Sequence, residues 1–189
     1  MLENNTAALY VCLSEKVDTS QAQSILKEIA IDSQKNNSLL KDLSEKILKP
    51  NVKSIDNETE FGDAFKLIYV LRQYIERNEK LDAANLHIVS SKLAMLEKLL
   101  DEKYFIAKNR VIKTIERDSG AFQSLSLDSF ASFFDRISFD QAKHLKLLSG
   151  LDEFCRASKK AVTEIEVQVA FPSDLPHEAL LLESYKKGI

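Results

Sequence analysis

The chain has 189 residues and a net charge of -3 at pH 7, with 26 basic and 29 acidic side chains. Its 4 glycines and 3 prolines are too few for the turn-rich α/β, β-sandwich and β-barrel classes, so long helices are favoured. The composition also excludes collagen-like and Pro/Gly-rich disordered chains. The lysines are scattered and acids are in slight excess, which does not indicate a nucleic-acid surface.

The N-terminal quarter of the chain predicts short helices. Residues 7–13 are apolar and fit either a helix or a strand. A helix is expected over 20–33, where apolar side chains recur on one face, and Asn36 and Asn37 are expected to end it. A second helix over 38–49 should end before the following proline, because the residue before a proline disfavours the α region.

The middle of the chain carries the strongest helical signal. Residues 57–77 and 83–117 both show an apolar face, and Asp82 is expected to cap the second of these helices. Along that helix, apolar residues recur at steps of three and four: Leu86, Val89, Leu93, Leu96, Leu100, Tyr104, Ala107, Val111 and Ile115. The short break between the two helices predicts antiparallel packing. We therefore expect one all-α or mostly α domain over residues 1–189, a helical bundle around the long central helix 83–117.

The C-terminal third predicts three more short helices, over 128–137, over 138–148, and from the break at 149–152 to about 162. Residues 163–171 then alternate apolar and polar side chains with β-branched residues, which indicates a strand, although the preceding helix could equally continue through them. If they form a strand, residues 7–13 are the best partner. The bundle would then carry a small two-stranded sheet made from the chain ends.

A search for reactive groups finds no catalytic residue, metal site or cofactor motif in the sequence. Cys12 and Cys155 are far apart and are interpreted as thiols in a reducing compartment. No two histidines share a helical turn, and the isolated glycines exclude a phosphate-binding loop. Asp140 and His144 lie four residues apart, as a carboxylate orienting an imidazole would, but the favoured interpretation is an exposed helical pair.

Phenylalanine is concentrated near residue 130. Phe130, Phe133 and Phe134 share one face of a helix, and Arg136 follows them as a polar anchor. Such a cluster either packs on the rest of the bundle or forms an aromatic hot spot for a partner protein. The C-terminal segment with Leu180, Leu181, Leu182 and Tyr185 offers a second helix of this kind, spaced like a helix that binds in a groove or docked on the core.

The sequence therefore predicts a non-enzymatic protein–protein interaction module, such as an adaptor, an inhibitor or immunity protein, or a host-directed effector. Its partner would be another protein, and a homo-oligomer is a further possibility. The alternative is a small-ligand-binding or enzymatic helical bundle that uses His144 and Asp140, and the third is a helical nucleic-acid-binding regulator. No membrane span or leader peptide is visible, so we expect a cytoplasmic protein, or one exported without a cleaved signal peptide.

Overall fold

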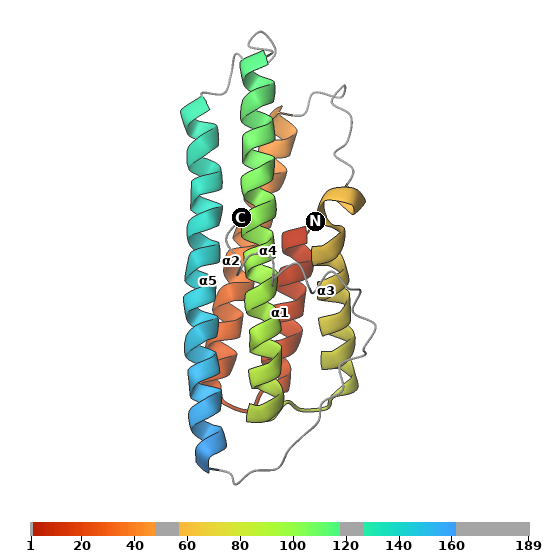
Figure 1. The fold of residues 1–189 in the computed structure, drawn as a ribbon, viewed down its shortest axis with the longest axis vertical. Helices are drawn as coiled ribbons and strands as arrows, with labels where there is room; N and C mark the ends of the chain where they lie inside the picture. Colours follow the sequence, from red (N-terminus) through yellow and green to blue (C-terminus); the bar gives the residue numbers. More distant parts are fainter. Residues whose placement is uncertain (1, 48–56, 118–126, 162–189) are drawn as a thin grey trace, which may run out of the picture.

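The structure is a computed structural model that describes residues 2–47, 57–117 and 127–161, and nearly all of these residues are helical. Its five helices are α1 (Leu2–Lys16), α2 (Ser20–Ile47), α3 (Asn57–Arg77), α4 (Ala83–Arg117) and α5 (Leu127–Ala161), shown in Figure 1. The predicted all-α class is confirmed for these residues.

Contacts between the helices close into a ring. Among the described residues, α1 contacts α2 and α3, α4 contacts α3 and α5, and α2 contacts α5. In Figure 1 the helices run side by side along the long axis, and consecutive helices run in opposite directions. The most extensive contact of α4 is with α5 rather than with α3. The helix α4, which we expected at the centre of the fold, therefore contacts two other helices, as every other described helix does, and is not central.

The helices α3 and α4 have the predicted boundaries. The backbone N–H of Asn85 donates to Asp82 Oδ1 over 2.8 Å, so Asp82 caps α4 as expected. Between the helices, Val17 and Leu81 form an isolated parallel bridge, in which the Leu81 N–H donates to the Lys16 carbonyl over 2.9 Å. This bridge joins the α1–α2 link to the α3–α4 link at one end of the molecule.

Two of the longest helices cross breaks that the sequence predicted. Asn36 and Asn37 lie inside α2 with buried side chains, and Ser138 and Gly150 lie inside α5. Each interruption costs a helix only about 0.5–1 kcal/mol in propensity. Continuing each helix lets apolar side chains beyond the interruption, such as Leu148, stay in the common core. Packing therefore outweighs local preference, and the predicted ends at 33, 137 and 148 are wrong.

Residues 7–13 belong to α1, so of the two alternatives left open for them the helix is confirmed, and they form no strand of a small sheet. The reason is burial on two sides, because α1 packs against both α2 and α3. A helix satisfies its own backbone hydrogen bonds in that position, whereas a strand would need a paired neighbour. The other predicted strand, 163–171, and the segment with Leu180–Leu182 lie outside the described residues.

One continuous hydrophobic core runs between the helices. All five contribute to it, with fully buried side chains that include Leu9, Leu13, Leu26, Ile29, Leu71, Ile75, Leu93, Leu96, Leu100 and Ile137. Both cysteines are free thiols: Cys155 is buried in this core and Cys12 is half-buried at its edge. Burial raises the pKa of the Cys155 thiol to about 11.

Candidate functional site

The phenylalanine cluster predicted to bind a partner faces mainly inward. Phe130 and Phe134 are buried, and Phe133 is half-buried with its ring edge-on to Phe134 at a centroid distance of 5.4 Å. Arg136 is exposed on α5. While the helices stay packed, Phe130 therefore contributes to the core and offers no surface to a partner.

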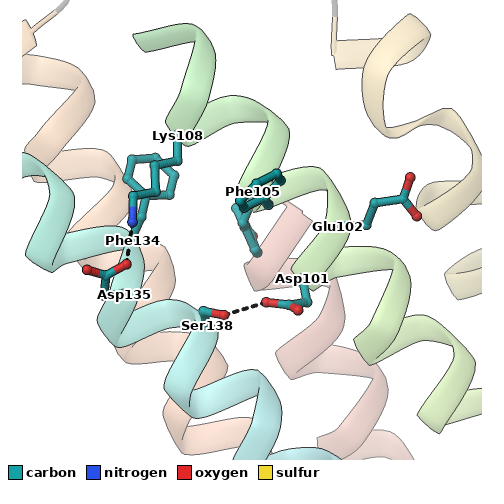
Figure 2. Close-up of a pocket in the computed structure, with 8 residues that line it drawn as sticks. Asp101, Glu102, Phe105, Lys108, Phe134, Asp135 and Ser138 are labelled. Atoms are coloured by element: carbon teal, nitrogen blue, oxygen red, sulfur yellow. Dashed lines mark hydrogen bonds and ion pairs between the residues drawn. The ribbon is translucent and has the colours of Figure 1, made fainter. Parts of the chain in front are cut away.

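Phe134, however, also lines an open pocket of about 220 Å³ between α4 and α5. Figure 2 shows Phe105 on α4 beside two contacts that join the helices, one between Lys108 and Asp135 and one between Asp101 and Ser138. The Ser138 hydroxyl donates to Asp101 Oδ1 over 2.6 Å. The remaining lining residues are Glu102 and Tyr104.

The pocket combines an exposed aromatic ring with excess negative charge. Phe105 is 65% exposed, one of the most exposed large apolar side chains among the described residues. Three carboxylates line the pocket against one lysine, and that lysine is paired with Asp135. Among the described residues, no cation lies within ion-pair distance of Asp101 or Glu102. Figure 2 shows that the Glu102 side chain points away from α5. This surface is suited to a cation.

A second group of polar side chains lies deep in the core, between α1, α2, α4 and α5. Its most buried members are Glu3, Ser33, Asn36, Glu97, Gln141 and His144, each no more than 1% exposed. Tyr10 and Tyr104 add phenol groups, and Asp32 lies at the edge. We call this set the buried polar cluster.

Glu97 is the hub of the cluster. Its carboxylate accepts a hydrogen bond from the Tyr10 hydroxyl over 2.5 Å and lies 3.0 Å from His144 Nδ1. Gln141 Nε2 donates to Glu3 Oε1 over 3.5 Å, at the limit of a hydrogen bond. The exposed Asp140–His144 pair expected from the sequence is wrong, because His144 is fully buried, and its partner is Glu97 of the facing helix rather than Asp140.

At the edge of the cluster, Lys143 joins α5 to α2. Its ammonium group lies 2.8 Å from Asp32 Oδ2 and 2.7 Å from Glu28 Oε1. Burial disfavours the charged Asp32 carboxylate, but hydrogen bonds from Lys143 and Lys35 outweigh burial and lower its pKa. Asp32 therefore stays ionised beside His144, whose Nε2 is 3.8 Å away.

The environment of the cluster shifts the pKa values of its ionisable groups. Burial, with a smaller contribution from the negative charge of Glu97, raises the pKa of Glu3 to about 7. Burial also opposes a charged imidazole, but the hydrogen bond and charge of Glu97 outweigh it and raise the pKa of His144. Burial and the Glu97 charge raise the pKa of Tyr10, which stays a neutral donor. The cluster therefore holds a hydrogen-bonded pair, Glu97 with His144, beside the Glu3 carboxyl group, whose pKa is about 7.

Several atoms in the cluster have no hydrogen-bond partner among the described residues. They are Glu3 Oε2, Ser33 Oγ, both polar side-chain atoms of Asn36, Tyr104 OH, Gln141 Oε1 and His144 Nε2. Ser33 and Tyr104 are near enough to Glu3 to lower its pKa, although neither meets hydrogen-bond geometry. Each unpaired buried group costs about 1–3 kcal/mol. The cluster therefore needs a polar contribution from outside its own side chains.

A third polar site lies between α4 and α5, where a pocket of about 290 Å³ is lined in part by Ser90, Ser91 and Asp152. His87 Nδ1 contacts the Asp152 carboxylate. The Ser90 hydroxyl lies 2.9 Å from the His87 carbonyl and 3.3 Å from the same carboxylate, so it donates to these oxygens rather than to the imidazole. This is not the serine-to-histidine contact that nucleophilic catalysis needs.

Within the described ranges, no group of three or more metal-ligating side chains is arranged to hold a metal ion, and no helix has the length and apolarity needed to cross a membrane. Comparisons of the chain with protein-family models, with curated proteins and with solved structures found no match.

Sequence reasoning missed the buried polar cluster, although a signal for it exists. Glu97 lies four residues after Leu93 and three before Leu100, on the apolar stripe of α4. On α5, Gln141 and His144 continue the spacing of Ile137 towards the C-terminus. Polar residues at the buried register of two helices that pack together predict a contact between them. No such signal exists for the exposure of Phe105. This residue is apolar and lies beside the apolar stripe of α4, so its position in the sequence suggests burial.

Proposed function

We propose that the chain is a non-enzymatic protein-interaction module that binds a basic side chain of its partner in the pocket between α4 and α5. Such a module would act as an adaptor, as an inhibitor or immunity protein, or as a host-directed effector. The observation that carries the proposal is the exposed ring of Phe105 beside carboxylates that have no basic partner among the described residues.

The chemistry of the pocket fits an arginine or lysine. A guanidinium group can stack on the Phe105 ring while its N–H groups reach the Asp101 carboxylate. Phe134 supplies an apolar wall for the aliphatic part of the same side chain. Of the residues predicted to bind a partner, Phe133 supports that wall, Arg136 lies exposed next to Asp135, and Phe130 holds the helix in place.

A selection from a displayed library of random peptides tests the proposal, with the full chain as bait. We expect enrichment of peptides that carry arginine or lysine. Because a cation over an exposed aromatic ring is worth about 0.5–1 kcal/mol, Phe105→Ala should weaken their binding by about two- to fivefold. Asp101→Asn should weaken it as well. The measurement is the dissociation constant of each enriched peptide.

Tyr69 provides the matched control, because it is 62% exposed on α3, a helix that does not line the pocket. Tyr69→Ala should leave binding unchanged. Equal losses for Phe105→Ala and Tyr69→Ala, or enrichment of peptides without basic residues, would contradict the proposal.

A second candidate is a small-ligand-binding or enzymatic helical bundle, favoured by the burial of His144 against Glu97. Its polar groups converge from four helices, as they do in ligand sites built between helices. A panel of small polar metabolites that raised the melting temperature, with the rise lost in His144→Gln, would favour this candidate. The acid-lined pocket gives no support to a nucleic-acid-binding regulator, because carboxylates repel phosphate.

The remaining parts of the proposal concern assembly and location. We propose that the five helices form a helical bundle, that the protein acts in the cytoplasm or is exported without a cleaved signal peptide, and that homo-oligomers form where no other partner is present. Light scattering coupled to size exclusion measures the oligomeric state. A mass equal to one chain at every concentration would contradict the homo-oligomer.

A further inference from the structure

The buried polar cluster has unpaired hydrogen-bonding atoms on each of four helices. Glu3 Oε2 belongs to α1, the Asn36 amide to α2, Tyr104 OH to α4, and Gln141 Oε1 to α5. All four residues are at least nine-tenths buried. In native proteins, buried groups of this kind are almost always paired, with protein atoms or with ordered water.

We propose that the buried polar cluster is an internal hydration site, in which ordered water molecules bridge the unpaired atoms of α1, α2, α4 and α5. Water would thus be a structural component of the core rather than solvent at its surface. The site is separate from the pocket of the proposed function, although Tyr104 lines both.

Water fits the chemistry of the unpaired atoms better than an ion or an apolar molecule does. The set mixes acceptors, such as Gln141 Oε1, with donors, such as Asn36 Nδ2, and hydroxyls that serve as either. A water molecule donates twice and accepts twice, so it can join unlike groups. A metal ion would leave donors such as the Asn36 amide N–H without a partner, and no set of described residues is arranged to hold one.

The charges around the site leave no need for a charged occupant. On α4 and α5, Glu97 is paired with His144, and the edge carboxylate Asp32 of α2 is paired with Lys143. Glu3 of α1 is the remaining ionisable group facing the site besides the two tyrosines. A neutral, strongly hydrogen-bonding occupant is therefore favoured.

Oxygen-17 magnetic relaxation dispersion of water tests the proposal on the full chain. The method detects water molecules that stay inside a protein for longer than the protein takes to rotate. We expect a dispersion in the folded wild-type chain that disappears when the chain is unfolded in denaturant. A folded wild-type chain without any dispersion overturns the proposal.

Substitutions then locate the water. Gln141→Met and Asn36→Leu keep side-chain size and remove polar atoms, so each should reduce the dispersion amplitude. Gln34→Met on the exposed face of α2 makes the same chemical change outside the cluster and should leave the amplitude unchanged. An amplitude that falls equally in Gln34→Met overturns the assignment, and if the core variants do not fold, the wild-type comparison decides alone.

Native mass spectrometry separates water from another occupant. Water is lost on gentle activation, so we expect the mass of the chain alone. A retained small molecule that is released on unfolding would overturn the hydration site.

Discussion

At the scale of single residues, the core of this protein is defined as much by its polar side chains as by its leucines. Glu97 on α4 accepts one hydrogen bond from Tyr10 on α1 and lies against His144 on α5, so one carboxylate joins three helices. A buried charge without a partner is strongly unfavourable, whereas a well-paired one is tolerated. The contacts of Glu97 therefore restrict how these helices can pack. Leucine contacts alone impose a weaker restriction on the packing.

Glu3 should make stability depend on pH. Its pKa is raised from 4.5 to about 7 in the folded chain, so the folded state binds this proton more tightly than the unfolded state does. The contribution of Glu3 to the free energy of unfolding should therefore be fully present below pH 4.5, fall as pH rises towards 7, and level off above that pH. The shift corresponds to a loss on the order of 3 kcal/mol.

Urea denaturation of Glu3→Gln between pH 5 and 8 measures this effect, with urea chosen because it adds no ionic strength. The variant should lose the share of the pH-dependent decrease that Glu3 contributes, leaving the share of His144, whereas Glu15→Gln, on the exposed face of α1, should retain the full decrease. Parallel pH curves for wild type and Glu3→Gln would show that Glu3 does not titrate in this range.

The Glu97–His144 pair should behave as a coupled unit. Removing one partner leaves the other charge buried, so Glu97→Gln and His144→Gln should each cost about 3–5 kcal/mol. The double variant should cost clearly less than the sum of the two, because neither charge remains. A double-mutant cycle from denaturation curves at pH 6 measures the coupling, and additive losses would refute it.

At the scale of elements, the boundaries of α3 and α4 follow from the sequence, whereas the breaks that the sequence predicts inside α2 and α5 are wrong. The periodic apolar face of 83–117 and the cap at Asp82 are local signals. Local signals determine helix boundaries where tertiary packing does not oppose them. Asn36 and Gly150 are also local signals, but there the packing of the whole helix opposes and outweighs them. The pocket at Phe105 could not be predicted, because it depends on how α4 meets α5.

Gly150 lies inside α5 with open space around it, since a Cβ added there would meet nothing within 4 Å. Alanine keeps the helix and reduces the freedom of the unfolded chain, so Gly150→Ala should raise stability by about 0.5–1 kcal/mol. Thermal unfolding measures the gain. The adjacent Leu151 is fully buried, and Leu151→Ala should cost about 2–5 kcal/mol. If Gly150→Ala were destabilising, the continuity of α5 through this point would be in doubt.

At the scale of the whole molecule, one core and a closed ring of helix contacts predict cooperative unfolding. All five described helices contribute buried side chains to one hydrophobic cluster, so none of them packs in a core of its own. Opening any one helix would expose the side chains of its two neighbours. The protein should therefore unfold as a unit.

Native-state hydrogen exchange measures this cooperativity. The amides of Leu9 and Leu13 on α1 should exchange with the same free energy of opening as those of Leu93 and Leu96 on α4, and that value should equal the global free energy of unfolding. Exchange of the α1 amides at a much lower free energy would mean that α1 detaches on its own.

The two thiols differ in a way that has a practical use. Cys155 is closed off within the core and is held protonated by its surroundings, whereas Cys12 lies at the rim of the same core on α1. A maleimide dye should thus attach to the folded wild-type chain at one place only, and the second thiol should become reactive when the helices separate. The protein carries its own reporter of opening, and no engineered cysteine is needed to read it.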